Sequence, residues 1–143
     1  MVLYNFTVNS GMELEVKKLI IQGKYVGSFD FEYDPPADIC LIPLCSIGKV
    51  KIHGDYEIFD DDSVEIKFNI NYLISGQCSY CLEKSEKTVD YLSEILFVPE
   101  NDGENYYYDG FKIKLDTAVN DAILISQPNI LLCKEDCKGI DVT

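Results

Sequence analysis

The sequence contains no arginine: all 12 basic residues among its 143 are lysines, set against 25 aspartates and glutamates. Proteins that hold nucleic acid directly gather Lys and Arg on one face, because neutralising phosphates supplies most of the affinity. Arginine is also the side chain best suited to bidentate contacts with phosphate and guanine. A net charge of −13 therefore argues against direct RNA or DNA binding. It favours a basic protein partner, or simply solubility.

Histidine is nearly absent as well, since His53 is the only one. It falls on the polar side of an alternating segment, and we interpret it as a surface residue. Most acid–base chemistry built on histidine is thereby excluded. The sequence also has no glycine-rich phosphate loop, G-x-S-x-G or H-E-x-x-H motif,. We therefore expect a protein that is not an enzyme.

No apolar run is long enough to span a bilayer, and the segment 19–27 is interrupted by Gln22 and Lys24,. The start of the chain lacks the layout of a secretory signal. We expect a cytoplasmic protein without a membrane partner. Residues 1–143 suffice for one domain with its own core, patterned more weakly over 1–45 than over 46–143. Because cytoplasmic thiols stay reduced, the six cysteines favour metal binding or reactivity over disulfides,.

Alternating apolar and polar residues predict strands over 49–58 and 64–74, with Gly54 at a bulge or a close backbone approach,. A short strand is expected over 1–8, a strand or helix over 12–21, and a loop over 31–40 because of two prolines. Residues 87–99 favour a strand over a helix because Val, Tyr, Ile and Phe dominate. Residues 106–115 suit a strand or hairpin.

One helix is predicted over 117–126, with Asp116 as N-cap and Pro128 ending it,. Val119, Ile123 and Ala122 would face the core. The predicted fold is α+β: an antiparallel, partly barrel-like sheet with one C-terminal helix packed on it.

Two cysteine pairs carry the most specific pattern. Cys78 and Cys81 form C-x-x-C at the predicted tip of a hairpin, and Cys133 and Cys137 form C-x-x-x-C near the end. Tetrahedral zinc takes four thiolates in two local pairs whose separation along the chain is unconstrained. The spacing predicts a structural zinc site shared by the two pairs. The simpler alternative is that the thiols are not associated with one another in any site.

A redox role of the first pair is the other alternative. A thioredoxin-type site places C-x-x-C at the start of a helix, which lowers the pKa of the first thiol. Glu83 and Glu86 would instead raise the pKa values of the nearby thiols, partly offset by two lysines,. Cys40 and Cys45 are expected to be small buried or loop side chains and not ligands.

Two stretches resemble the YceD family, the large-ribosomal-RNA accumulation proteins of bacteria and plastids. "INYLISGQCSYCLEK" (70–84) is similar to that family's strand followed by C-x-R-C-L, with Tyr80 standing where Arg is common. "KLDTAVNDAILISQPNILLCKEDCKGI" (114–140) is similar to its helix, proline and C-x-x-D-C-K-G-L. The matching positions are Cys78, Cys81, Leu82, Leu115, Pro128, Cys133, Asp136, Cys137, Lys138 and Gly139.

The resemblance implies a non-enzymatic factor for accumulation of large-subunit ribosomal RNA during ribosome assembly. Lys114 and Ala122 stand at positions that are often acidic in the family, so any role of those carboxylates does not carry over. Because the chain is acidic and lacks arginine, we expect a basic ribosomal protein or assembly factor as its partner. Contact with ribosomal RNA would then be weak or indirect.

Overall fold

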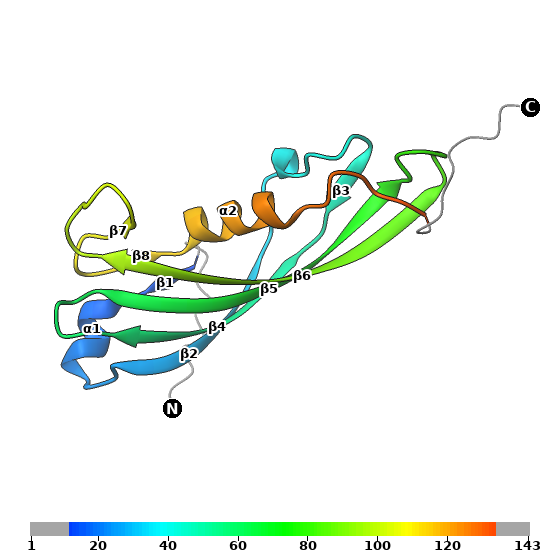
Figure 1. Cartoon of the computed structure of the whole chain (residues 1–143). Helices are drawn as coiled ribbons and strands as arrows, with labels where there is room; N and C mark the ends of the chain where they lie inside the picture. The colour runs from blue at the N-terminus through cyan, green and yellow to red at the C-terminus, as the bar shows by residue number, and fades with distance from the viewer. Residues whose placement is uncertain (1–11, 134–143) are drawn as a thin grey trace, which may run out of the picture.

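The computed structural model describes residues 12–133, so the strand expected over 1–8 and Cys137 lie outside the described residues. Figure 1 shows an elongated molecule built around one twisted sheet. In chain order the elements are β1 (Glu13–Leu14), α1 (Val16–Ile21), β2 (Val26–Tyr33), the 3-10 turn η1 (Ala37–Ile39), β3 (Cys45–Ile47), β4 (Val50–Ile58), β5 (Val64–Gln77), β6 (Lys84–Val98), β7 (Tyr106–Tyr107), β8 (Ile113–Lys114) and α2 (Asp116–Ser126).

The main sheet has the strand order β2-β4-β5-β6-β7, and β3 pairs with β5 outside this path. Its pairings are antiparallel except for the short parallel contact of β6 with β7. β1 and β8 form a separate two-stranded sheet. The α+β prediction is confirmed. The sheet does not close into the barrel-like form that was expected: it stays open between β2 and β7, and α2 packs against one of its faces (Figure 1).

The predicted strands over 49–58 and 64–74 are confirmed as β4 and β5. Burial alternates strictly along β4, and every second residue of β5 from Val64 to Ile74 is buried. The register runs without interruption across Phe29, Gly54 and Phe68 on three neighbouring strands. Gly54 is therefore a point of close approach and not a bulge.

The segment over 87–99 is a strand, as favoured, and β6 is longer than predicted. It pairs with β5 over 14 residues, from Val64–Phe97 to Gln77–Lys84. The resulting hairpin extends beyond β2 and β4, with β3 paired to its outer part, and Cys78 to Cys81 lie at its tip (Figure 1).

Helix α2 packs on the inner face through Ala118, Val119, Ala122 and Ile123, which are all buried as the predicted helix face requires. The expected N-cap is wrong: Leu115 occupies the N-cap position and Asp116 is the first helical residue, without a side-chain cap bond. The Asp116 carboxylate instead accepts the backbone N–H of Met12 at 3.3 Å. It still places negative charge in the first turn, which the helix dipole favours.

Three further expectations change in detail. Residues 12–21 divide into β1 and the helix α1, and β2 was not predicted. The loop expected over 31–40 begins only after Tyr33, because Phe31 continues the buried alternation and pairs with Ile52. The segment over 106–115 is not a hairpin: β7 pairs with β6, whereas β8 pairs with β1.

Candidate metal centre

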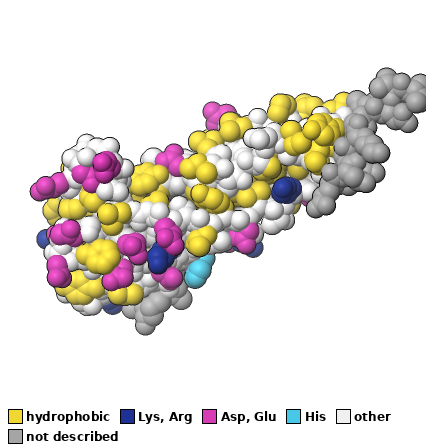
Figure 2. Space-filling view, viewed as in Figure 1, with side chains coloured by type: hydrophobic (Ala, Val, Ile, Leu, Met, Phe, Trp, Pro, Cys, Tyr) yellow, Lys and Arg dark blue, Asp and Glu magenta, His cyan; other side chains and the backbone are white. Residues whose placement is uncertain are grey.

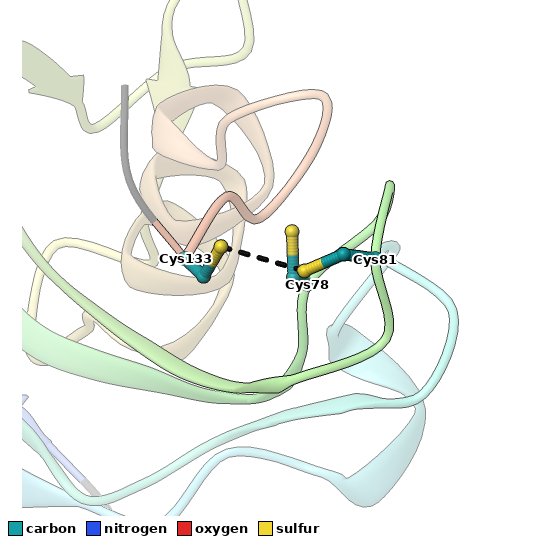
Figure 3. A group of neighbouring side chains, drawn as sticks. All are labelled: Cys78, Cys81 and Cys133. Carbon is teal, nitrogen blue, oxygen red and sulfur yellow. Dashed lines mark hydrogen bonds between the residues drawn. The ribbon is translucent and has the colours of Figure 1, made fainter. Parts of the chain in front are cut away.

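The tip of the β5–β6 hairpin is a compact turn that begins at Cys78. The backbone N–H of Cys78 donates to the carbonyl of Glu83 at 2.7 Å, and the N–H of Leu82 donates back to the carbonyl of Cys78 at 2.9 Å. Leu82 adopts a left-handed backbone conformation, with φ of 65°. This turn reverses the chain within C-S-Y-C and brings the two thiols close together (Figure 3).

The segment after α2 is fastened to this tip by two hydrogen bonds. The N–H of Ser79 donates to the carbonyl of Leu131 at 2.6 Å, and the N–H of Leu131 donates to the hydroxyl oxygen of Ser79 at 3.0 Å. The Leu131 side chain is fully buried. These contacts carry Cys133 to the tip, although it lies 52 residues after Cys81 in the chain.

The sulfur atoms of Cys78, Cys81 and Cys133 all lie within 4.8 Å of one another. Those of Cys81 and Cys133 are 3.4 Å apart. Cys78 is buried and the other two are half-buried. Figure 3 shows the side chains converging from the hairpin and from the segment that follows α2.

This arrangement fits a thiolate-bound metal ion. Zinc–sulfur bonds of about 2.3 Å in a tetrahedral site place neighbouring sulfurs about 3.8 Å apart. One sulfur pair here is 3.4 Å apart and no pair is farther apart than 4.8 Å, so shifts of about 1 Å or less would complete three corners of a tetrahedron,. Three of the four predicted ligands are thus brought together, and the fourth, Cys137, lies outside the described residues.

The electrostatics of Cys78 also suit a metal ligand. Burial raises the pKa of its thiol, but the backbone N–H groups of Cys81, Tyr80 and Cys133 and the Cys81 side chain stabilise the thiolate, and the pKa falls to about 6. The prediction that nearby Glu83 would raise the thiol pKa is wrong for Cys78. Direct hydrogen bonds to the sulfur outweigh an exposed carboxylate, whose field water screens,.

The hairpin does not have the layout of a thioredoxin-type site. Strand β6 begins at Lys84, directly after the C-S-Y-C turn, so within the described part of the chain no helix starts at the pair. Cys78 is fully buried, whereas an attacking thiol needs to be reached by its substrate,.

The remaining residues behave as expected of side chains outside the site. Cys40 and Cys45 are half-buried beside η1 and in β3. The Cys45 thiol donates to the carbonyl of Gln77 at 3.7 Å, and burial raises its pKa. His53 is an exposed residue on β4, as predicted, and its Nδ1 lies 2.6 Å from a carboxylate oxygen of Asp30.

The role of Ser79 and Leu131 was not predicted from the sequence. Serine and leucine do not by themselves indicate such a contact, because the two hydrogen bonds form only when the chain after α2 runs back along the hairpin. The nearest sequence signal was Pro128, which prevents the helix from continuing and so marks where the chain leaves it.

After comparison with known proteins, the resemblance to the YceD family stays a prediction from the sequence. No protein-family model matches the chain, and neither the curated proteins nor the solved structures contain a match. Among residues 12–133, no helix has the length and apolar character needed to cross a membrane.

Proposed function

We propose that this protein is a non-enzymatic factor for accumulation of large-subunit ribosomal RNA, with a structural zinc site formed by Cys78, Cys81, Cys133 and Cys137. The observation that carries the proposal is the convergence of three thiols from two distant segments. Those two segments are the ones that resemble the YceD family. Because these two segments meet in space, cysteines from both would be ligands of one zinc ion.

A structural role for the metal follows from the donors. Sites closed by four thiolates hold zinc for stability, whereas catalytic sites keep an open position. A zinc ion there would tie the hairpin tip to the segment after α2. The lowered pKa of Cys78 supports this role, because the ligand must be a thiolate and the thiol is then largely ionised near neutral pH,.

The charge of the whole chain indicates what kind of partner it has. With a net charge of −13 and no arginine, the protein is suited to a basic ribosomal protein or assembly factor in the cytoplasm,. Contact with ribosomal RNA would be weak or indirect. Tight binding of purified protein to large-subunit RNA at physiological salt, without a partner, would contradict this.

The zinc site is tested by elemental analysis of full-length protein purified without chelator. We expect about one zinc ion per chain, lost in Cys78→Ser, Cys133→Ser and Cys137→Ser. Cys45→Ser, which changes a half-buried cysteine outside the cluster, is the matched control and should keep its zinc. Chelation should lower the melting temperature, because metal binding energy becomes folding energy. Wild-type protein free of bound metal would refute the site.

The assembly role is tested by isolating ribosomal particles with the tagged protein. We expect co-purification with large-subunit precursors and a reduced level of large-subunit RNA when the protein is depleted. Unchanged RNA levels on depletion would refute it.

A thiol–disulfide oxidoreductase using Cys78 and Cys81 is the second candidate, favoured by the low pKa of Cys78,. It predicts that the protein reduces insulin disulfides and that Cys78→Ser abolishes this activity. We expect no such activity, because the thiol is buried.

A further inference from the structure

A hollow lies at the end of the molecule opposite the cysteine cluster, where Figure 1 shows β7 and β8. It is an open groove of about 850 Å³ framed by β7, β8 and the end of β6. Its aromatic lining consists of Phe97, Tyr106, Tyr107, Tyr108 and Phe111. We refer to it as the aromatic groove.

The aromatic groove combines fixed rings with exposed ones. Tyr106 stacks on Phe97 with ring centroids 5.3 Å apart, and its hydroxyl donates to Asp121 at 2.6 Å. Tyr107 and Phe111 are 54% and 58% exposed. The Phe111 ring already receives a cation of this chain, since the ammonium of Lys17 lies 6.0 Å from its centroid. Exposed aromatic faces attract the charged head groups of lysine and arginine.

A second hollow of about 420 Å³ adjoins the aromatic groove and shares Tyr106 with it. It is lined by three carboxylates, Glu65, Glu94 and Glu104, and we call it the acidic hollow. One lysine, Lys67, approaches Glu65, at 3.9 Å. Figure 2 shows acidic and hydrophobic side chains interleaved over this end of the molecule.

Charges in the aromatic groove itself are balanced. Lys112 and Lys114 line it together with Glu13 and Asp109, and Lys112 lies 3.9 Å from Glu13. The excess negative charge therefore belongs to the acidic hollow. Burial, together with the hydrogen bond to Asp121 and the negative charge of that carboxylate, raises the pKa of Tyr106 to about 12,.

We propose that the aromatic groove and the acidic hollow together dock a segment of a basic protein that is rich in lysine and arginine. The rings take the aliphatic stems and charged head groups, and Glu65, Glu94 and Glu104 neutralise the neighbouring charges. This inference rests on the basic partner of the proposed function and gives that partner a place to bind. Phosphate-bearing ligands fit poorly beside three carboxylates.

The test measures binding of a fluorescent oligoarginine peptide to the full-length, metal-loaded protein by anisotropy. The Tyr107→Ala/Phe111→Ala double variant removes two exposed rings without changing charge, and we expect its affinity to fall about tenfold. Leu92→Ala/Ile125→Ala is the matched control, since both residues are exposed and lie outside both hollows, and should bind within about twofold of wild type,. Equal binding by the two double variants would overturn the proposal.

A charge-matched pair of variants separates a site from general attraction between opposite charges. Glu65→Gln/Glu94→Gln removes two carboxylates of the acidic hollow, and Glu86→Gln/Asp90→Asn removes two exposed ones elsewhere on β6. We expect the first pair to weaken peptide binding at least fivefold more than the second. Equal losses, or stronger binding of single-stranded RNA than of the peptide, would overturn the proposal. Melting curves of every variant confirm that it is folded.

The outcomes also separate this inference from the proposed function. If ribosomal particles co-purify equally with wild type and with Tyr107→Ala/Phe111→Ala, the groove assignment fails and the assembly role stands. If the peptide binds as expected but no ribosomal component co-purifies, the assembly role fails and the groove stands.

Discussion

At the scale of single residues, Gly54 shows how closely the strands of the main sheet approach. It lies on β4 between Phe29 of β2 and Phe68 of β5. A Cβ atom at this position would lie 2.6 Å from the Phe29 ring, 2.7 Å from the carbonyl oxygen of Lys67 and 2.8 Å from the Cβ of Phe68. The backbone carbonyl cannot rotate away, so any side chain must displace the strands.

We therefore expect Gly54→Ala to lower the free energy of unfolding by about 1–3 kcal/mol, as overpacking does. Gly48→Ala is the control, because its nearest neighbour beyond the adjoining residues is the carbonyl oxygen of Leu73 at 3.9 Å. That substitution should leave stability unchanged or slightly higher. Urea denaturation measures both, and equal stabilities of the two variants would contradict the close approach.

Cys78 makes the stability of the metal-free protein depend on pH. Its thiol pKa is about 6 in the folded protein, lowered from 9.0, so the unfolded chain binds more protons between these values. The free energy of unfolding should therefore rise as the pH increases from about 6 to about 9. Below pH 6 the Cys78 thiol is protonated in the folded protein as well, and this stabilisation is lost.

The melting temperature of chelator-treated, reduced protein across this range measures the effect. Cys78→Ser should show a flatter dependence on pH. The ultraviolet absorbance of the thiolate offers a second measurement, with a midpoint near 6 in wild type that Cys78→Ser removes. Identical pH profiles of the two proteins would contradict the lowered pKa.

At the scale of elements, α2 holds the inner face of the sheet by one buried stripe and several polar contacts. The hydroxyl of Tyr33 donates to Asn120 at 2.8 Å, and the hydroxyl oxygens of Tyr72 and Ser126 lie 2.6 Å apart. Just past its end, Gln127 donates to the carbonyl of Ile39 at 2.7 Å. The helix is thereby fixed to β2, β5 and η1 together.

Two isoleucines on this helix allow a matched test of the packing. Ile123 is fully buried, whereas Ile125 is 70% exposed. We expect Ile123→Ala to cost about 2–5 kcal/mol of stability and Ile125→Ala to change it by less than about 0.5 kcal/mol. Chemical denaturation of both variants decides this, and a similar cost for the two would contradict the packing of α2.

The elements that were predicted well are those whose signal is local. β4, β5 and the face of α2 follow from periodicity alone, because each has one clearly buried side,. Other features depend on pairing partners that no local pattern reveals. β7 and β8 have two residues each and are strands only because they pair with β6 and β1. Asp116 accepts a hydrogen bond from the backbone N–H of Met12 instead of capping its own helix.

At the scale of the whole molecule, the excess of acidic residues destabilises the folded state through repulsion between like charges. The five lysine–carboxylate pairs of the described chain span 3.6–3.9 Å, and every lysine in them is more than half exposed. Such pairs contribute little. They therefore do not offset the self-repulsion of a chain with a net charge of −13,.

Added salt should accordingly stabilise the protein. Raising the ionic strength from about 0.01 M to about 0.15 M shortens the Debye length from about 30 Å to about 8 Å and screens the repulsion. We expect a higher melting temperature at neutral pH, with a smaller gain nearer the isoelectric point of about 4.3. A melting temperature that falls with salt would show that the ion pairs dominate.

By itself the sequence determined the α+β class, the two alternating central strands, the buried face of the helix and the acidic character, because each depends on neighbours in the chain. It also singled out the cysteine pairs. Only the tertiary structure decided that Cys133 meets Cys78 and Cys81, and that rings from β6, β7 and the following loop line one groove. The cysteines meet because the path after α2 joins residues 52 positions apart, and the rings meet because β7 pairs with β6. Neither contact follows from a local periodic pattern.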